Sequence, residues 1–434
     1  MVNASCSTVA VLGVPFNNVT MDEAVALIEE QIREGGFHQV ATANVDFLKN
    51  AMRDEELRDI LCSCEMVVPD GMPIVWMSRL LGTPLKERVS GIDLVERLAD
   101  VSARRGYGVF LLGASEVSSQ RAAKVLRQRY PGLRIVGRYS PAPQPLERMN
   151  HEEILRRIEE ARPQILLVAF GNPKQEQWIA MHRERLNVPV CIGIGGSLDM
   201  IAGSVSRAPR WMQSSGLEWM HRMVLEPKRL AVRYFHDAVC LIRHLPGYLA
   251  ATAIQPKRVK KHGAQGIEVQ QVGNTKLISM IGDLTGPALA EFNACSRDAY
   301  REGMNIVLDM SRTGYMGPES LGSLIYLESR MRMRREQLWL AEMPRHLSRV
   351  LRTGQLHNYF MTTTMVGDAL YRTAKAEQRQ LASFAPAWEI PRQETAYVDV
   401  RIELLQDVCR RIISAEETED SALVPDAFAA SAGS

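Results

Sequence analysis

Four long apolar runs, separated by stretches with helical periodicity, dominate the first half of this chain of 434 residues. The runs lie in HQVATANVDF, YGVFLLGAS, PQILLVAFGNPKQE and VPVCIGIGGSLD, and each leads into a turn rich in glycine or polar residues. Continuous apolar strands that alternate with helices are typical of a mostly parallel sheet covered by helices on both faces. We therefore expect an α/β fold with a Rossmann-like sheet between about residues 10 and 200.

Polar residues and glycines gather where these expected strands end. They are Thr42, Asn44, Asp46, Asp70, Gly113, Gly171, Asn172, Gln175, Gly195, Gly196 and Asp199. The carboxyl ends of parallel strands meet at one edge of a sheet, and open α/β sheets bind their ligands there. The sequence therefore predicts an active cleft along this edge.

The composition is that of an ordinary globular protein of two or three domains. Hydrophobic residues make up 46% and charged residues 24%, and the formal net charge of +2 excludes no class of partner. The seven cysteines form no C-x-x-C pair, which favours reduced thiols over a zinc site. The sequence shows no signal peptide and no run of about 18 apolar residues, so we expect a cytoplasmic protein without a membrane-spanning helix.

A second strand–helix rhythm follows the polar, basic stretch QPKRVKKHGAQG. Strands are expected in KLISMIG, MNIVLDMS and EQLWLAEM, and a helical pattern follows each of them. We expect a first domain over 1–254, a linker over 255–265, a smaller α/β domain over 266–365 and a partly disordered tail over 366–434. Within the tail, YVDVRIELLQDVCRRIISA is a possible helix.

Several common catalytic motifs are absent from the sequence. No G-x-G-x-x-G follows the first strand and no G-x-x-x-x-G-K-[ST] occurs anywhere, which disfavours a dinucleotide-dependent oxidoreductase. H-E-x-x-H and G-x-S-x-G are missing as well. The chemistry must therefore be sought in other motifs.

Five motifs carry a resemblance to a known family: TANVDF, VPDGMPIVW, RVSGIDLV, AFGNPKQEQWI and GIGGSLDMIAGSVSRAPRWMQSSGLEWMHRMVLEPKRLAVRY. In order and spacing they resemble the WecG/TagA/CpsF family of bacterial glycosyltransferases, over roughly residues 8 to 250. The resemblance implies an enzyme that moves N-acetylmannosamine, its uronic acid or a related hexose from UDP to a polyprenyl-diphosphate-linked sugar. Members make teichoic acids, common antigen and capsular or exopolysaccharides of the bacterial cell surface.

The aspartate of the family's DG motif is its proposed general base, and Asp70 holds that position here. A sugar hydroxyl must lose its proton as it attacks the anomeric carbon, and a positioned carboxylate accepts that proton. A single displacement of this kind inverts the anomeric centre. Taken by itself, Pro69-Asp70-Gly71 is an ordinary turn at the end of a strand.

Three further positions match polar positions of the family. Thr42 and Asn44 would hold the sugar or the catalytic base by hydrogen bonds, although capping at the strand end accounts for Asn44 equally well. Gln175, in the family's G-x-P-x-Q-E turn, is expected to contact the donor. Lys174 and Glu176 are expected to lie in solvent at the start of a helix.

The leaving UDP carries a growing diphosphate charge that the site must stabilise. No Asp-x-Asp pair occurs in the chain, so we expect no metal ion and no other cofactor. Amides of the glycine turn at Gly195 and Gly196, together with arginines, are the expected donors. The candidate substrate-binding residues are Asn44, Arg88, Gly113, Asn172, Gln175, Gly195, Gly196, Arg207, Glu218, Arg222, Arg229 and Arg233.

Residues from about 220 to 250 are expected to form a basic amphipathic appendage. Its basic stripe is Arg229, Arg233, His236 and Arg243, and its apolar stripe is Leu230, Tyr234, Ala238, Leu241, Ile242 and Leu245. One interpretation is a solvated basic face above a core-packed face. The resemblance favours another, in which the helix docks on anionic lipids at the inner face of the plasma membrane and closes over the active site. Many relatives have paired arginines where this chain has Val232 and Arg233, so the diphosphate-binding arginine stays open.

Residues 266–365 resemble a STAS domain through GDLTG, NIVLDMSRTGYMGPESLGSLIYL and the order of strands and helices. Regulatory STAS domains often carry a phosphorylatable serine in D-S-S-G-L. Gly317 and Pro318 stand at the matching positions here, so that switch cannot operate. Ser320 is expected on the helix surface, and Glu319 adds negative charge to the first helical turn. We expect a docking or regulatory module that binds a protein partner and has no catalysis of its own.

A second hypothesis belongs to a different functional class. The chain would then be a catalytically weak, UDP-sugar-sensing scaffold that signals through the STAS-like domain. The presence of Thr42, Asp70 and Gln175 together favours an active enzyme. On either hypothesis the expected partners are a UDP-sugar, a polyprenyl-diphosphate-linked glycan and an anionic membrane surface, and no nucleic acid.

Overall fold

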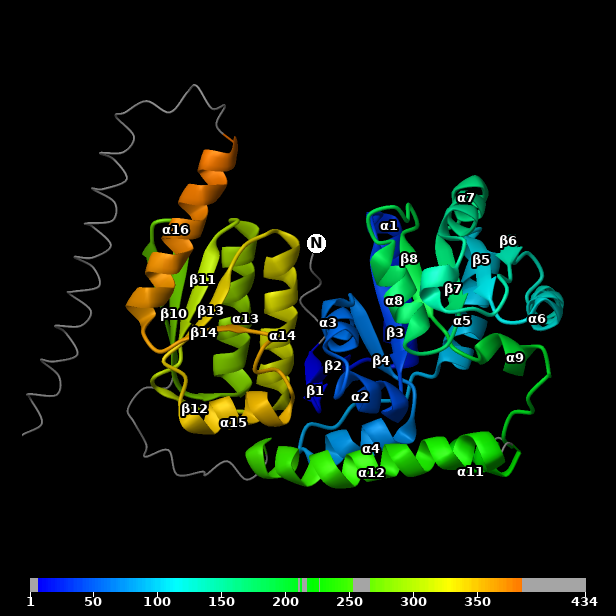
Figure 1. The fold of residues 1–434 in the computed structure, drawn as a ribbon, viewed down its shortest axis with the longest axis horizontal. Coiled ribbons are helices and arrows are strands. Elements are labelled where there is room, and N and C mark those ends of the chain that lie inside the picture. The colour runs from blue at the N-terminus through cyan, green and yellow to red at the C-terminus, as the bar shows by residue number, and fades with distance from the viewer. Residues whose placement is uncertain (1–6, 210, 213–216, 226, 253–265, 385–434) are drawn as a thin grey trace, which may run out of the picture.

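The computed structural model describes residues 7–209, 211–212, 217–225, 227–252 and 266–384. Two α/β bodies stand side by side, and an antiparallel ribbon of β1 (Thr8–Val11) and β2 (Val14–Asn17) lies between them (Figure 1). This arrangement confirms the predicted fold class, a mostly parallel α/β sheet followed by a smaller α/β body.

The first sheet has six parallel strands in the order β4-β3-β8-β7-β5-β6. In chain order they are β3 (His38–Ala43), β4 (Met66–Pro69), β5 (Gly108–Gly113), β6 (Arg134–Tyr139), β7 (Ile165–Ala169) and β8 (Val190–Gly193). Val40 packs into the core on one face, and the next residue, Ala41, packs into the core on the other. Burial on both faces explains why most of these strands are continuous apolar runs in the sequence.

Helices cover both faces of this sheet. One face carries α1 (Met21–Glu34), α5 (Gly91–Arg105), α6 (Glu116–Arg129) and α9 (Ser197–Ile201). The other carries α2 (Val45–Ala51), α3 (Glu55–Ser63), α4 (Met72–Leu80), α7 (His151–Ala161) and α8 (Lys174–Met181). The short η1 (Leu146–Arg148) precedes α7. Helix α3 begins separately from α2 because the side chain of Asp54 caps it, accepting a hydrogen bond from the Leu57 N–H at 3.1 Å.

The second body is built on a sheet in the order β12-β10-β11-β13-β14, with β9 antiparallel to β10 and the remaining pairs parallel. Its strands are β9 (Gly266–Val272), β10 (Thr275–Leu284), β11 (Asn305–Asp309), β12 (Thr313–Met316), β13 (Leu338–Ala341) and β14 (Met361–Thr363). Its helices are α13 (Gly286–Arg301), α14 (Pro318–Met333), α15 (Arg345–Thr353) and α16 (Val366–Phe384). The predicted strands β10, β11 and β13 are present, whereas β9, β12 and β14 were not anticipated.

Helix α16 belongs to the second body, although the sequence assigns residues from 366 onward to a tail. Ala369 and Leu370 are buried in a core cluster with Val307 and Trp339 of the sheet. The expected boundary at 365 therefore falls just before a helix that packs on this domain. The possible helix in YVDVRIELLQDVCRRIISA lies outside the described residues.

The second body docks on the β1–β2 ribbon through α14. A side chain at Gly322 would place its Cβ 2.5 Å from the carbonyl oxygen of Thr8, so only glycine fits there. Gly13 has a positive φ of 83°, and a Cβ there would lie 2.0 Å from the carbonyl oxygen of Gly354. Ser320 is not on the surface, as the sequence suggested: it is 1% exposed, and its hydroxyl donates to the carbonyl of Leu284. Helix α14 is therefore buried between its own sheet and the ribbon.

Helices α11 (Glu218–Leu225) and α12 (Pro227–Thr252) run along the lower edge of the first body in Figure 1, beneath α2 and α4. We call this pair the strap. Leu230 is buried as predicted, but Ile242, expected in the same apolar stripe, is 75% exposed. Exposed Val232, Phe235 and Val239 join Ile242 in a second apolar stripe that the sequence analysis missed. Across the described ranges, no helix has both the length and the apolar character needed to cross a bilayer.

Candidate active site

Thr42 and Asp70 lie on neighbouring strands at the carboxyl edge of the first sheet. Thr42 is the last residue but one of β3; it is 3% exposed, and its hydroxyl donates a hydrogen bond to the carbonyl of Gly193 at 2.8 Å. Asp70 directly follows β4, and its backbone N–H donates to the carbonyl of Ala43 at 2.9 Å. The parallel pairing of β3 and β4 therefore brings the two proposed catalytic residues to one place, as the sequence analysis anticipated.

Asn44 adopts the capping role that the sequence left open. Its side-chain oxygen accepts a hydrogen bond from the Asp46 N–H at 3.0 Å and so starts α2. A Cβ at Gly71 would lie 3.7 Å from that of Asn44, so the capped turn borders the Asp70 turn. Contact between Asn44 and a sugar stays a prediction.

A backbone hydrogen bond brings Arg88 to the same edge, because the Val89 N–H donates to the carbonyl of Pro69 at 3.0 Å. Burial disfavours the charged form of Arg88. Two effects outweigh burial and raise the pKa of the guanidinium. One is the hydrogen bond from its Nη1 to Glu218 Oε2 at 2.8 Å, and the other is the negative charge of Glu218, Asp70 and Asp93. Arg88 therefore brings positive charge to the part of the edge where Asp70 lies.

Arg88, Arg207 and Glu218 form one ionic cluster with Asp93. Arg207 Nη2 contacts Asp93 Oδ1, and its Nε lies 3.9 Å from Glu218 Oε1. Arg88 Nη2 lies 3.6 Å from Asp93 Oδ2. The sequence placed the first three residues in the site but missed Asp93. A signal was present, because Ser90 caps α5 and Asp93 stands three residues later, at a position favoured for carboxylates.

The side chain of Gln175 connects two glycine turns by hydrogen bonds. Its Oε1 accepts hydrogen bonds from the Gly171 N–H at 3.2 Å and the Gly195 N–H at 3.0 Å, and its Nε2 donates to Glu176 Oε1 at 2.8 Å. The Gly195 N–H therefore already donates to a side chain, and it is not the free hydrogen-bond donor to the diphosphate that the sequence predicted. Gln175 is only 1% exposed. Its contact with the donor stays a prediction.

Glu176 corrects a sequence expectation, since it is 1% exposed rather than solvated. Burial raises the pKa of its carboxyl to about 8, although the hydrogen bond from Gln175 opposes the shift. The carboxyl is therefore protonated at neutral pH. Lys174 is also partly buried: its Nζ donates to the carbonyl of Gln144 at 2.5 Å and lies 5.2 Å from the ring centroid of Phe170. Neither residue stands at a solvated helix start.

A second charged network ties the site to the strap. Asn172 Nδ2 donates to Asp46 Oδ2 at 3.3 Å, and Lys49 contacts the other oxygen of Asp46. Lys49 also pairs with Asp237 of α12 at 2.8 Å, and both of these side chains are largely buried. Lys49 and Asp237 were not anticipated, since a lysine on an amphipathic helix ordinarily faces solvent.

The remaining predicted site glycines fall into two groups. No atom of the described chain lies within 4 Å of the Cβ position of Gly171, Gly195 or Gly196, so space lies in front of these turns. Gly113, at the end of β5, instead meets the carbonyl oxygen of Ala169 at 2.7 Å and has a φ of 97°. Close backbone packing is therefore enough to require a glycine at 113.

The predicted arginines of the strap are only partly placed. Arg233 lies on α12 with its guanidinium 5.3 Å from the ring centroid of Tyr234. The side chains of Arg222 and Arg229 lie outside the described part of the chain. Within the described part, no group of three or more His, Cys, Asp and Glu residues could hold a metal ion.

The sequence of this chain matches a known protein family and several of its relatives. The model of the family described as "Glycosyl transferase WecG/TagA/CpsF family" matches residues 9–253. The N-acetylglucosaminyldiphosphoundecaprenol N-acetyl-beta-D-mannosaminyltransferase of Staphylococcus aureus (strain MRSA252) is 28% identical over 260 residues, which cover 59% of this chain and 97% of that protein. The protein of the same name from Bacillus subtilis (strain 168) is 30% identical over 223 residues, 51% of this chain and 85% of its own length.

One similar solved structure is a small protein. The anti-sigma factor antagonist SpoIIAA in its unphosphorylated form aligns with 25% of this chain and 98% of its own, with 14% identity and a TM-score of 0.23. A likeness of this strength supports no argument, so the STAS assignment rests on the sequence motifs.

Proposed function

Because the chain belongs to the WecG/TagA/CpsF family of glycosyl transferases, we propose that it transfers N-acetylmannosamine or a related hexose from a UDP-sugar to a polyprenyl-diphosphate-linked acceptor. The printed names of the S. aureus and B. subtilis relatives, which state a mannosaminyl group and an N-acetylglucosaminyldiphosphoundecaprenol acceptor, support this choice. The reaction inverts the anomeric centre, and the product serves the synthesis of a cell-surface polysaccharide.

The observation that carries the proposal is the position of Asp70 at the carboxyl edge, next to the strand that holds Thr42 and close enough to Arg88 for their charges to interact. In the proposed reaction, Asp70 accepts the proton of the acceptor hydroxyl as that oxygen attacks the anomeric carbon. Thr42 stays bonded to Gly193 and holds the shape of the cleft floor, since its hydroxyl proton is donated there.

The diphosphate leaving group needs positive charge, which Arg88 and Arg207 supply in our proposal. Both guanidinium groups now contact carboxylates of Glu218 and Asp93. A phosphate offers the same pair of acceptor oxygens as a carboxylate, so the donor diphosphate replaces Glu218 as the partner of Arg88. We propose that no metal is needed, and we expect turnover to survive EDTA. Activity lost to EDTA and restored by Mg²⁺ or Mn²⁺ would overturn this part.

We propose that the enzyme works as a peripheral protein on the cytoplasmic membrane surface, where a polyprenyl-linked acceptor resides. The support is the second apolar stripe, whose Val232, Phe235, Val239 and Ile242 are all exposed on α12. Exposed His236 and Arg243 lie on the same helix. An exposed apolar stripe flanked by basic residues suits the interface of an anionic bilayer.

Asp70→Asn tests the central assignment. We expect UDP release from a UDP-hexosamine, in the presence of a lipid-diphosphate acceptor, to fall by about a hundredfold or more, because a general base typically contributes this much. Donor binding should persist, since the substitution removes charge but little volume. Asp100→Asn is the matched control, because Asp100 is half-exposed on α5 and pairs with Arg104 of the same helix.

Two results would contradict the proposal. Turnover near the wild-type rate in Asp70→Asn would exclude Asp70 as the base. A wild-type chain that binds the UDP-sugar but releases no UDP with any lipid-diphosphate acceptor would favour the sensing scaffold instead.

A further inference from the structure

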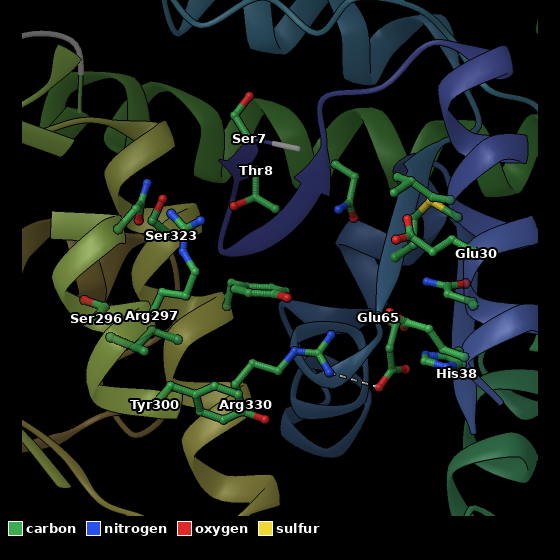
Figure 2. A pocket seen from close by; sticks show the side chains of 18 of the residues that line it. Ser7, Thr8, Glu30, His38, Glu65, Ser296, Arg297, Tyr300, Ser323 and Arg330 are labelled. Atoms are coloured by element: carbon green, nitrogen blue, oxygen red, sulfur yellow. Dashed lines mark hydrogen bonds and ion pairs between the residues drawn. The ribbon is translucent and has the colours of Figure 1, made fainter. Parts of the chain in front are cut away.

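A cavity of about 470 Å³ lies between the two bodies (Figure 2). One wall is formed by α1, the ribbon and the beginnings of β3 and β4, and the other by α13 and α14. Pockets that bind small molecules commonly measure roughly 300–1,000 Å³ and lie at the interfaces of domains. In size and position this cavity is suited to a small-molecule ligand.

The cavity lies at the opposite edge of the first sheet from the candidate active site. His38 and Met66 line it and stand at the beginnings of β3 and β4, whereas Thr42 and Asp70 stand at the far ends of those strands. A ligand in the cavity therefore occupies a second site, separate from the donor and acceptor.

The wall from the second body presents hydrogen-bond donors. Arg297 lines the cavity and pairs with no carboxylate among the described residues. In Figure 2 its side chain extends from α13 toward Ser323. Two further donor groups, the buried Nε of Arg330 and the hydroxyl of Ser296, have no hydrogen-bond partner in the described chain, and Ser296 is only 4% exposed. This wall suits an anionic group such as a phosphate.

The wall from the first body presents acceptors. The buried Oε1 of Gln31 has no hydrogen-bond partner within the described ranges, and the carboxylates of Glu30 and Glu34 line the cavity near it. All three carboxylates that line this wall already interact with other groups: Glu65, for example, accepts from the Gln39 N–H at 2.7 Å and lies 3.5 Å from Arg330 Nη1. Amide and carboxylate oxygens along one wall suit a ligand that brings hydroxyl donors.

We propose that this cavity is an effector site for a small phosphorylated sugar. The phosphate lies against Arg297 and Arg330, and the sugar hydroxyls donate to Gln31 and the neighbouring carboxylates. A sugar phosphate carries acceptors at one end and donors at the other, which matches the opposite polarity of the two walls. Tyr300 and Tyr326 add aromatic surface beside the sugar ring. Because the ligand touches both bodies, its binding stabilises their contact.

Calorimetric titration of the full chain with a hexose 6-phosphate tests the proposal, with the unphosphorylated hexose and inorganic phosphate as comparison probes. We expect wild type to bind the hexose 6-phosphate more tightly than either probe. Arg297→Ala should weaken its binding by at least about tenfold, since hydrogen bonds to charged groups are large enough for that change. Arg301→Ala, on the same helix but outside the cavity lining, should bind as wild type does.

A second variant separates the two ends of the ligand. Gln31→Leu removes the acceptor on α1, so it should weaken binding of the hexose 6-phosphate and leave the weak binding of inorganic phosphate unchanged. The proposal is overturned if wild type binds no hexose 6-phosphate up to about 10 mM, well above a millimolar Kd. It is also overturned if Arg297→Ala binds as tightly as Arg301→Ala, or if inorganic phosphate binds as tightly as the sugar phosphate.

Discussion

Two parts of the chain contact the first body in different ways. The strap is held at the carboxyl edge by ion pairs, and the second body is held at the ribbon by close packing. At the carboxyl edge, Glu218 of the strap pairs with Arg88 at 2.8 Å, and Asp237 pairs with Lys49 at the same distance. At the ribbon, Gly322 of the second body lies against the backbone of Thr8. An ion pair can exchange one partner for another of like charge, whereas close-packed backbone tolerates little displacement. We therefore expect the strap to move more readily against the first body than the second body does.

The same contrast runs along α12 itself. Tyr248, in its last turns, is fully buried and donates a hydrogen bond to the carbonyl of Ala10 at 3.0 Å. The earlier turns carry the Asp237 ion pair and the exposed apolar stripe. Pro246 lies between the two parts and has no N–H for the helix ladder. We therefore expect the end of α12 that holds Tyr248 to stay in place and its earlier turns to be the part that moves.

The largest expected effect concerns the buried carboxyl of Glu176 at the carboxyl edge. Its pKa of about 8 in the fold exceeds the ordinary value of 4.5, so the unfolded chain loses this proton first as pH rises. The buried, protonated carboxyl makes its full contribution to the free energy of unfolding below pH 4.5. This contribution declines by about 1.4 kcal/mol for each pH unit up to the pKa in the folded state. Glu176→Gln, which mimics the protonated acid, should remove this decline. Urea unfolding at several pH values between about 5 and 8 measures it.

Glu184→Gln provides the control for this prediction, because Glu184 is exposed and close in sequence. Its free energy of unfolding should follow the pH dependence of the wild type. If Glu176→Gln and wild type lose stability in parallel as pH rises, Glu176 is ionised in the fold, and the carboxyl edge does not depend on a neutral acid.

The packed interface gives the second prediction. Gly322→Ala introduces a methyl group 2.5 Å from the Thr8 carbonyl, which belongs to the backbone and has little room to shift. We expect a loss of about 2–3 kcal/mol in the free energy of unfolding, as is usual for overpacking. The same substitution at Gly247, an exposed position of α12 with no described atom within 4 Å of its Cβ, should be neutral or stabilising. Equal stability of the two variants would show that the second body docks loosely.

The sequence was sufficient for most of the fold, for reasons visible in particular elements. Strands β5, β7 and β8 are buried on both faces and are therefore continuous apolar runs. Strand β9 is mostly exposed at the sheet edge, and β14 has only three residues, so neither leaves a strong apolar signal. Helix α16 was assigned to the tail because polar residues interrupt the short buried segment around Ala369 and Leu370.

Prediction of the site from sequence succeeded where chemistry and strand ends coincide, as at Thr42 and Asp70. It failed where tertiary contacts decide whether a charge is exposed. Glu176 looks like a solvated residue in the first turn of a helix, yet that turn packs beneath Gly193, where a Cβ would lie 2.5 Å from the Glu176 carboxyl. Asp237 looks like part of a polar face, but its partner Lys49 comes from a helix far away in sequence. Such pairings leave no local pattern.

The smallest effect concerns the exposed stripe of the strap. Phe235 is 66% exposed, and in the proposed membrane contact its ring enters the lipid interface. Phe235→Ser should therefore lower partitioning onto vesicles with anionic lipids by about tenfold, the change expected when most of an aromatic side chain is no longer buried. Arg243→Ala should lower it by about fivefold, since each cation near such a surface contributes about 1 kcal/mol, and only this effect should fade as salt rises. Met181→Ser, at a similarly exposed position on α8, is the control and should partition as wild type does. Equal partitioning of all four proteins would mean that the stripe faces water and that the protein does not contact lipid through the strap.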